Sequence, residues 1–218
     1  MLSGAEEALA VVHEHILVCT ACPLHARRTQ AVPGTGPASA RIMAVGEGPG
    51  ETEDRLGKPF VGAAGNVLTR LLESIGLHRD DIYITNTVKC RPPGNRDPEP
   101  SEVDTCAPFL DAQIEIIEPD LILILGRHAL ARLLPGAGGI TQLHGRRVRR
   151  GDRIYVPLYH PAAALYNASL MRTLEDDMLR VRQYLDEAEG ERTLRGAAAA
   201  REAAAAVPLD HDQLILFE

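Results

Sequence analysis

The run Leu121-Ile122-Leu123-Ile124-Leu125-Gly126 is uninterrupted and apolar, and a glycine closes it. Such a run favours a strand that is buried on both faces of a sheet, because a strand with one solvent face alternates apolar and polar residues. Further strands are expected at 41–45, 81–88 and 154–158, and helices are expected at 3–17, 67–75, 101–118, 128–133 and 169–188. Strands that alternate with helices pair in parallel through right-handed crossovers. The sequence therefore predicts an α/β fold: a three-layer α/β/α domain with a central four-stranded parallel sheet.

The ends of the expected strands indicate where a ligand would bind. Gly46, Asn86, Gly126 and His160 each stand at or just after the end of such a strand. In open parallel sheets, ligands bind at the carboxyl ends of the strands. We therefore expect the segments that begin at these residues to meet at one edge of the sheet and to form the functional site.

Length and composition limit the class of protein. The chain has 218 residues, a net charge of −7 and a pI of about 5.6. We expect one domain over 1–190, followed by an Ala-rich flexible tail over 191–218. No apolar run approaches the roughly 18 residues of a membrane span, and the first residues carry acids where a secretory signal carries bases. A cytoplasmic protein with no membrane segment is expected, and the acidic balance argues against a protein that coats nucleic acid.

The four cysteines are grouped in two pairs, Cys19-x-x-Cys22 and Cys90-x15-Cys106. In a chain without an export signal, clustered cysteines are more often metal ligands or redox groups than disulfides. Four thiolates hold either zinc or an iron–sulfur cluster, and the spacing alone does not separate the two. A thioredoxin-like redox pair is a weaker alternative, because the CxxC precedes the first strand. Four unrelated buried thiols are the remaining structural interpretation.

A glycine-rich segment follows the first expected strand and reads Gly46-Glu47-Gly48-Pro49-Gly50, with Glu51, Glu53 and Asp54 after it. The glycines fall as G-x-G-x-G, so they do not match the G-x-G-x-x-G of dinucleotide-binding proteins. The segment is also acidic, and we expect it to be a loop that does not lead directly into a helix. Carboxylates at this place suit the handling of water or of a developing cation better than the binding of a pyrophosphate. A solvated surface loop is the alternative.

Several motifs in a fixed order resemble the family 4 uracil-DNA glycosylases, the iron–sulfur branch of the uracil-DNA glycosylase superfamily. The resemblance covers roughly residues 15–186. It rests on these pieces: Cys19-x-x-Cys22, Gly46-Glu47-Gly48-Pro49-Gly50-x-x-Glu53-Asp54, Gly57-x-Pro59-Phe60-Val61-Gly62-x-Ala64-Gly65, Asn86-Thr87-Val88-Lys89-Cys90-Arg91-Pro92-Pro93, Asn95-Arg96, Cys106 and His160-Pro161-Ala162-Ala163. It implies a DNA repair enzyme that hydrolyses the N-glycosidic bond of deoxyuridine, releases uracil and leaves an abasic site.

The resemblance also implies a role for individual residues. Phe60 would stack on the uracil ring after the base has flipped out of the duplex. The Asn86 amide would pair with uracil N3–H and O4, and the Gly48 backbone amide would also contact the base. His160 would donate a hydrogen bond to O2 of the departing uracil anion, and Leu165 would fill the space that the base leaves in the DNA.

Water and the developing sugar cation need a carboxylate in this interpretation. Gly48 stands where several sister families carry an Asp, so their familiar general base is absent. Glu47 and Glu53 are the candidates, and we favour Glu53 acting with Asn95. Each single residue has an ordinary structural interpretation, such as the capping of a turn by Asn86.

Cofactor and partners follow from the same resemblance. Cys19, Cys22, Cys90 and Cys106 would hold a 4Fe-4S cluster, with zinc as the less favoured alternative. Uracil-containing DNA would be the substrate, with the four arginines of 143–150 as a phosphate-contact patch. Neither Lys58 nor Lys89 is expected to be desolvated enough for Schiff-base chemistry, so the enzyme is expected to be monofunctional.

The end of the chain carries a separate motif. The peptide Gln213-Leu214-Ile215-Leu216-Phe217 resembles the one that docks bacterial repair proteins on the replication sliding clamp. The alternative is an apolar terminus that packs on the domain. We expect a monomer from a prokaryote that acts at the nucleoid. Two other functions remain open: a non-catalytic iron–sulfur or zinc module that binds nucleic acid, and a nucleotide-binding oxidoreductase that uses the glycine-rich segment.

Overall fold

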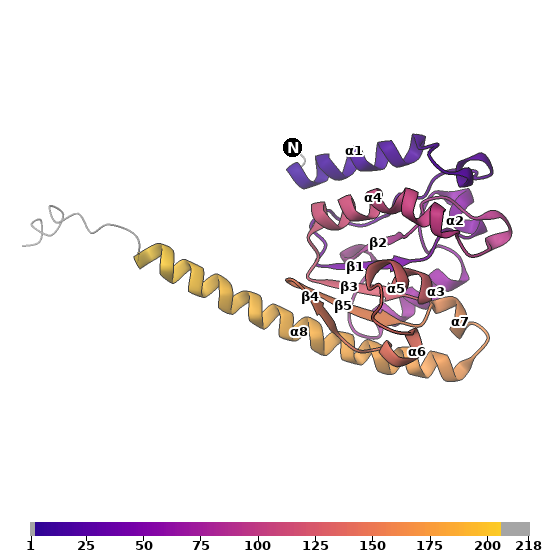
Figure 1. Ribbon diagram of the computed structural model, residues 1–218. Helices are drawn as coiled ribbons and strands as arrows, with labels where there is room; N and C mark the ends of the chain where they lie inside the picture. The colour runs from indigo at the N-terminus through magenta and orange to yellow at the C-terminus, as the bar shows by residue number, and fades with distance from the viewer. Residues whose placement is uncertain (1–2, 206–218) are drawn as a thin grey trace, which may run out of the picture. The chain divides into compact units, whose positions relative to one another are not determined.

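The computed structural model describes the backbone of residues 3–205 and the side chains of residues 3–190. Its centre is a sheet with the strand order β2-β1-β3-β5-β4 (Figure 1). The strands are β1 (Ile42–Gly46), β2 (Tyr83–Asn86), β3 (Leu121–Leu125), β4 (Val148–Arg150) and β5 (Arg153–Leu158). The helices are α1 (Gly4–Val18), α2 (Glu51–Leu56), α3 (Ala63–Glu73), α4 (Pro100–Ile117), α5 (Arg127–Leu133), α6 (Ile140–Leu143), α7 (Pro161–Ala164) and α8 (Ala168–Ala205), with short 3-10 turns at Pro23–Ala26, Arg79–Asp81 and Pro93–Asn95.

The α/β class is confirmed, but the prediction of four strands, all parallel, is wrong. Strands β1, β2, β3 and β5 pair in parallel, whereas β4 is a fifth strand that pairs antiparallel with β5. Residues 148–150 do not alternate apolar and polar side chains, so their sequence carries no strand signal. They can still form an edge strand, because such a strand needs only backbone pairing to its single neighbour and tolerates charge. A tight turn at Gly151, with φ of +58°, returns the chain into β5.

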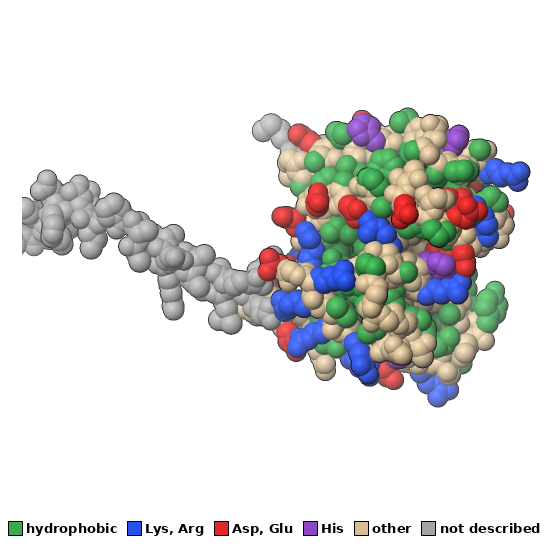
Figure 2. Space-filling model, in the orientation of Figure 1, with side chains coloured by type: hydrophobic (Ala, Val, Ile, Leu, Met, Phe, Trp, Pro, Cys, Tyr) green, Lys and Arg blue, Asp and Glu red, His purple; other side chains and the backbone are tan. Residues whose placement is uncertain are grey.

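The hairpin also moves the arginine-rich segment away from the carboxyl edge of the sheet. Arg150 pairs with Arg153 at the amino end of β5, which is the end opposite to the one that faces a ligand in a parallel sheet. The expected phosphate-contact patch therefore does not lie as one unit beside the strand ends. Figure 2 shows basic side chains (blue) interspersed with acidic ones (red) over the face in view.

Apolar helices cover both faces of the sheet. On one face, Met43, Val45, Ile122 and Ile124 belong to one buried cluster with side chains of α1, α4 and α5. Figure 1 shows α1 and α4 stacked on that side of the strands. The alternate residues of the same strands, such as Ala44 and Leu123, are equally buried on the other face. This side is covered by the apolar stripes of α3 and the first part of α8, which carry the buried residues Val67, Leu68, Leu71, Leu72, Leu174, Met178 and Val181.

Several helices differ from the expectation, among them α8, which continues beyond the expected end at residue 188. The segment expected to be a loop contains α2, which begins directly after Gly50 and ends at Gly57, whose φ is +69°. Helix α3 begins at Ala63, four residues earlier than expected. Helix α4 begins at Pro100, because Glu102 accepts a hydrogen bond of 2.8 Å from the backbone N–H of Glu99 and so closes the first turn.

The chain divides into two compact units between Arg182 and Gln183. The first unit contains the sheet and every residue of the candidate site. In the second unit, the backbone of α8 continues to Ala205. The clamp-like peptide at 213–217 lies outside the described residues. Over the part of the chain that is described, no helix is long and apolar enough to cross a bilayer.

Candidate functional site

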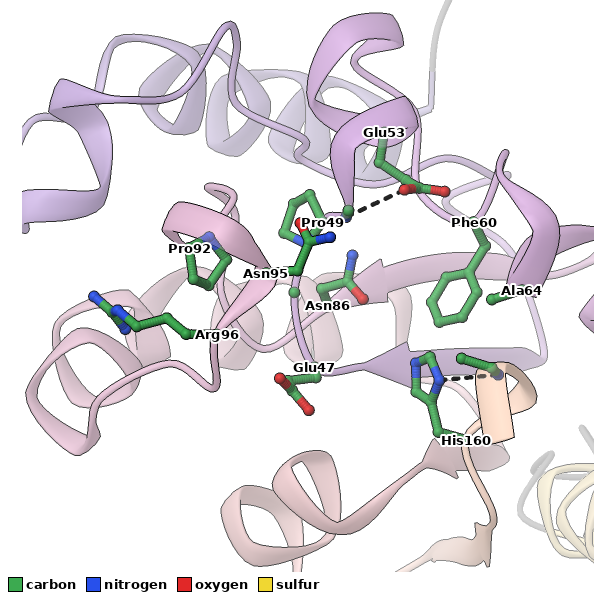
Figure 3. Close-up of a pocket in the computed structure, with 13 residues that line it drawn as sticks. Glu47, Pro49, Glu53, Phe60, Ala64, Asn86, Pro92, Asn95, Arg96 and His160 are labelled. Atoms are coloured by element: carbon green, nitrogen blue, oxygen red, sulfur yellow. Dashed lines mark hydrogen bonds between the residues drawn. The ribbon is translucent and has the colours of Figure 1, made fainter. Parts of the chain in front are cut away.

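A cavity of about 300 Å³ lies at the carboxyl edge of the sheet (Figure 3). It is lined by Glu47, Gly48, Pro49, Gly50, Glu53, Phe60, Ala64, Asn86, Pro92, Asn95, Arg96, His160 and Ala162. The set includes every residue that the sequence suggested for catalysis or base binding except Leu165. The expected convergence of the strand ends is therefore observed, and it brings together residues as far apart in the sequence as Glu47 and Ala162.

Parallel pairing places the first two strand ends side by side. Gly46 and Asn86 are partners in the register of β1 and β2. A Cβ added at Gly46 would lie 2.5 Å from Asn86 Oδ1 and 2.5 Å from Phe60 Cζ. Position 46 must therefore be glycine, since any side chain there would displace the amide and the aromatic ring. On the other side, Gly126 directly follows β3 with φ of +95°, and a Cβ there would lie 3.1 Å from His160 Cβ.

Phe60 is held in a conformation that a non-glycine residue rarely adopts, with φ of +51°. Such backbone is costly unless the surroundings enforce it. Here Arg79 donates to the carbonyl of Pro59, and a Cβ at Gly65 would lie 1.8 Å from Phe60 O, so only glycine leaves room for this turn. The ring is 94% buried (6% exposed), and its centroid lies 5.7 Å from that of His160. Phe60 is therefore a fixed aromatic wall of the cavity.

Asn86 presents a polar atom that has no partner. Asn86 is 1% exposed. Within the described part of the chain, its Oδ1 is the only buried side-chain N or O atom without a hydrogen bond. An unpaired buried acceptor costs about 1–3 kcal/mol. Because Asn86 lines the cavity, this atom is placed to accept a hydrogen bond from a ligand that carries an N–H or O–H group.

His160 is fixed in one tautomer by its own helix. Its Nδ1 accepts a hydrogen bond of 3.2 Å from the backbone N–H of Ala162, at the start of α7. A neutral ring that accepts at Nδ1 carries its proton on Nε2. Burial lowers the pKa of His160 to about 4, with the Glu53 charge acting weakly in the opposite direction. At neutral pH the residue is therefore an uncharged imidazole with an N–H to donate.

This lowered pKa predicts a pH dependence of stability. The unfolded chain binds a proton at His160 below about pH 6.5, whereas the folded chain does so only near pH 4. Stability from this residue is therefore complete above about pH 6.5 and falls by roughly 1.4 kcal/mol per pH unit between there and pH 4. Urea denaturation of the wild type and of His160→Gln at pH 7, 6, 5 and 4.5 measures the difference. Parallel curves for the two proteins would contradict the assignment.

The two carboxylates of the cavity differ in what they contact. Glu53 Oε1 accepts hydrogen bonds from the backbone N–H groups of Val61 (2.9 Å) and Gly62 (2.8 Å), and Oε2 accepts one from Gly50 (3.1 Å). Glu53 thus ties the glycine-rich segment to the loop that carries Phe60 (Figure 3). Burial raises the pKa of Glu47, while the nearby His128 acts in the opposite direction.

The Asn95 side chain is bonded to Arg91 and not to Glu53. Its Oδ1 accepts a hydrogen bond of 2.7 Å from Arg91 Nε. The hydrogen bonds of the pair therefore lead to different parts of the protein, and the expected cooperation between Glu53 and Asn95 has no contact to support it. Glu47, whose backbone is fixed by Val88 and Thr87, has the freer carboxylate.

The four cysteines line a separate small void. The other residues around it are Ile16, His25, Lys89, Thr105 and Phe109, and none of the cysteines forms a disulfide. No three of the four sulfur atoms lie within 4.8 Å of one another. A zinc ion with Zn–S bonds of about 2.3 Å would need sulfurs about 3.8 Å apart. The four sulfurs are therefore not as close together as the ligands of a single zinc ion.

The environment of the sulfurs also suits an anionic group. Arg28 Nη1 donates to Cys90 Sγ at 3.0 Å, and the backbone N–H of Lys89 donates to Cys106 Sγ at 3.4 Å. Burial raises the pKa of the Cys106 thiol to about 11. Because a metal group binds thiolates, the four thiols would release protons if they bound one.

Comparison with known proteins decides the family. The sequence profile of the Uracil DNA glycosylase superfamily matches residues 33–185. The Type-4 uracil-DNA glycosylase of Sulfurisphaera tokodaii is 47% identical over 186 residues, which cover 81% of this chain and 84% of the relative. That of Thermotoga maritima is 46% identical over 184 residues, which cover 83% and 96%. The chain belongs to the uracil-DNA glycosylase superfamily. The resemblance noted in the sequence is thereby confirmed.

Within the glycosylase fold, Leu165 lies beside the cavity rather than in it. It directly follows α7 and is 38% exposed, and the next residue, Tyr166, is 94% exposed. Sequence reasoning did not single out Tyr166. Its position directly after the expected wedge residue, in a chain with five tyrosines, was the available signal.

One further expectation was wrong, namely that Lys89 of the glycosylase is not strongly desolvated. Its side chain is fully buried, and burial lowers its pKa to about 7, so it is more desolvated than expected. Its Nζ is nevertheless bonded to Thr85 Oγ1, Asn86 O and Gln113 Oε1, each at 2.7 Å. The amine is therefore occupied beneath the strand end, and Lys89 is not among the residues that line the cavity.

Proposed function

We propose that this chain hydrolyses the N-glycosidic bond of deoxyuridine in DNA, releasing uracil and leaving an abasic site for base excision repair. One observation carries the proposal most directly: the unpaired buried Oδ1 of Asn86 in a cavity of about 300 Å³. Uracil N3–H can donate to this atom, whereas cytosine has an acceptor at N3. A site that leaves its buried polar group unpaired with the wrong base discriminates strongly against that base.

In the proposed complex, the base leaves the duplex and enters the cavity. It stacks on Phe60, pairs with the Asn86 amide and meets the Gly48 backbone amide. Cleavage leaves negative charge on uracil, and the Nε2–H of neutral His160 is the proposed donor to O2. A fixed donor aimed at developing charge stabilises the transition state more than the substrate.

The sugar develops positive charge in the same step, as in glycoside cleavage generally. We propose Glu47 as the carboxylate that faces this charge and orients the attacking water. Glu53, whose two oxygens accept three backbone hydrogen bonds, is proposed to hold the cavity walls together. Asn95 is proposed to shape the wall beside the sugar. This assignment replaces the preference for Glu53 and Asn95 that the sequence suggested.

Cys19, Cys22, Cys90 and Cys106 are proposed to hold a 4Fe-4S cluster. When bound, such a cluster would join the segment after α1, the end of the β2 segment and α4, so its proposed contribution is structural. The wide spacing of the sulfurs supports the cluster over zinc.

Replacing Cys106 by serine is expected to remove the visible absorbance of the freshly purified protein and to lower its thermal stability, because a ligand to a buried group is lost. Asp104→Ser, at an exposed position of the same helix that does not line the cysteine void, is the matched control and should keep both properties. A colourless wild type with one bound zinc per chain would contradict the cluster.

The remaining proposals concern partners. Leu165, supported by the exposed Tyr166, is proposed to enter the DNA where the base has left. The buried position of Lys89 Nζ supports a monofunctional enzyme without lyase chemistry. We further propose a monomer that acts on DNA in the prokaryotic cytoplasm, with residues 213–217 docking on the sliding clamp.

The decisive experiment measures base release from a synthetic duplex that contains one uracil. Release of free uracil, with an abasic site left in the strand, is expected, and the same duplex with cytosine should stay intact. Borohydride should trap no covalent adduct. Tight binding of the uracil duplex without release would instead indicate the alternative, a non-catalytic iron–sulfur module that binds nucleic acid.

A further inference from the structure

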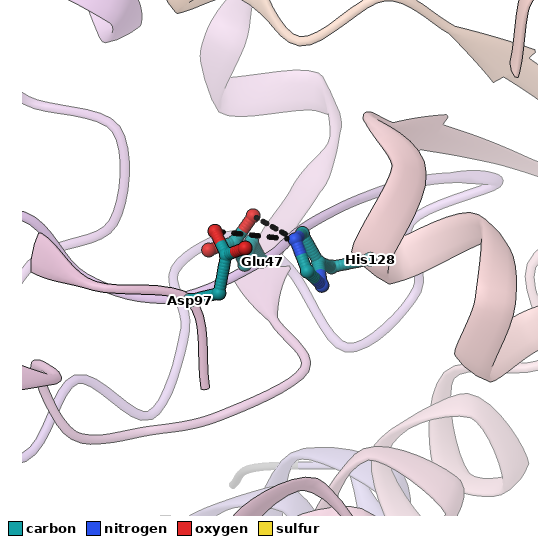
Figure 4. Close-up of side chains that lie close together, drawn as sticks. All are labelled: Glu47, Asp97 and His128. Atoms are coloured by element: carbon teal, nitrogen blue, oxygen red, sulfur yellow. Dashed lines mark ion pairs between the residues drawn. The ribbon is translucent and has the colours of Figure 1, made fainter. Parts of the chain in front are cut away.

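Polar side chains gather beside the cavity and also beneath it. Beside it, in a partly exposed group, His128 Nε2 lies 3.3 Å from Asp97 Oδ1 and 3.7 Å from Glu47 Oε2 (Figure 4). The group beneath the end of β2 is buried and has the side chain of Lys89 at its centre. Its amine bonds the backbone of Asn86, the residue proposed to pair with the base. The buried group therefore bears directly on base recognition.

Each N–H bond of the Lys89 amine has an acceptor. The ammonium form carries three N–H bonds, and Nζ lies 2.7 Å from each of Thr85 Oγ1, Asn86 O and Gln113 Oε1. Lys89 is 1% exposed, so water does not compete for these hydrogen bonds. A buried ammonium is costly unless it is hydrogen-bonded. A shift of the Asn86 carbonyl away from Nζ would therefore be resisted.

Gln113 of α4 holds the amine in place. Its side chain is buried, and Nε2 donates to the carbonyl of Pro33 at 2.9 Å and to the hydroxyl of Tyr83 at 2.8 Å. Both N–H bonds of this amide are thus used, and Oε1 is left to face Lys89. Helix α4 therefore fixes the amine, and the amine fixes the carbonyl at the end of β2.

The side chain of Asn86 needs such support from its backbone. Its Oδ1 has no hydrogen-bond partner in the protein, so no bond to this atom holds the amide before the base arrives. The carbonyl of the same residue, in contrast, is bonded to Lys89. A displacement of about 1 Å at a positioned group can lower a rate by about 10²-fold, so the place of this carbonyl matters for the reaction.

We propose that Lys89, anchored by Gln113, is a positioning residue that fixes the backbone of Asn86 and so sets where its amide meets the base. The proposal rests on the proposed function. It gives the buried amine a use other than covalent chemistry, since Lys89 does not line the cavity.

Replacing Lys89 by methionine removes the amine and keeps the length of the side chain. In single-turnover uracil excision we expect K89M to be slower by about 10- to 100-fold. The concentration of free uracil that halves the wild-type rate should rise by a similar factor in K89M, whereas the affinity for a duplex without uracil should not change. The backbone N–H that bonds Cys106 Sγ remains in K89M, so the visible absorbance should match that of the wild type.

Two further variants separate positioning from support of the fold. K89M leaves buried acceptors unpaired and should lose stability. K89M/Q113M removes one of them, while Pro33 O keeps its bond from Thr85 and the Tyr83 hydroxyl keeps its bond to His13. Stability should recover in part, and excision should stay slow. T85V removes a different bond of the amine, so it should lose stability and yet excise uracil within about twofold of the wild-type rate.

The double variant N86A/K89M should be no slower than N86A, because the lysine acts through Asn86. Additive losses would overturn the positioning role. So would excision that returns with stability in K89M/Q113M, a T85V protein as slow as K89M, or a loss of visible absorbance that accounts for the slow rate. A wild type that releases no uracil would instead reject the proposed function, whereas a K89M protein as fast as an active wild type rejects this inference alone.

Discussion

Replacing Asn86 by alanine is expected to lower single-turnover excision of uracil by about 10⁴-fold, because the group that pairs with the base is lost. The same change removes a buried acceptor that has no partner in the free protein. Stability should therefore stay constant or rise by about 1 kcal/mol. Excision rates from a uracil duplex and urea denaturation measure the two effects. Their opposite signs are the signature of a ligand-binding amide rather than a structural one.

The matched control is Asn66→Ala, which removes the same side chain from an exposed position of α3. It should excise uracil at the wild-type rate. An Asn86→Ala protein that is destabilised by several kcal/mol and yet still active would show that the amide supports the fold. In that case the selection of uracil would have to come from other residues of the cavity.

His160→Ala is the second change with a large expected effect, a loss of about 10²- to 10³-fold in the single-turnover rate. The reason is the loss of the Nε2–H that we propose to meet uracil O2. Because His160 is neutral at pH 7, the wild-type rate should not fall between pH 8 and pH 6 through protonation of this residue. His160→Gln, which keeps an N–H donor at similar reach, should recover part of the rate.

The exposed His15 on α1 provides the control, since His15→Ala removes an imidazole far along the chain from the strand ends. Binding of the uracil duplex should change little in His160→Ala, because the donor acts on charge that develops only during cleavage. A His160→Ala protein that binds weakly but cleaves normally would reject the role in the transition state.

The parts of the fold that were predictable are those where side-chain chemistry and burial agree. Strands β1, β2, β3 and β5 are rich in apolar residues, and most of these residues are buried. Strand β4 is held only by backbone pairing to β5, so its arginines gave no strand signal. Helix α2 was missed for a related reason. Its acids, Glu51, Glu53 and Asp54, look like a solvated loop after three glycines, yet acids are favoured in the first turn of a helix.

The site shows the same division. Asn86 and His160 could be found because each stands at the end of an apolar strand, where topology dictates the location. The proximity of Asp97 and His128 could not be predicted, since the two residues belong to separate segments of the chain that meet only in the folded protein. The burial of Lys89 was equally hidden. It depends on Gln113 of α4, which lies 24 residues further along the chain.

The short segment between Asn86 and Cys90 links the two halves of the site. Lys89 bonds the carbonyl of Asn86 through its amine, while its own backbone N–H bonds the sulfur of Cys106. The four cysteines and Asn86 are therefore joined through a single residue. Loss of the proposed cluster is then expected to loosen the backbone that carries Asn86, so that uracil excision and thermal stability decline together.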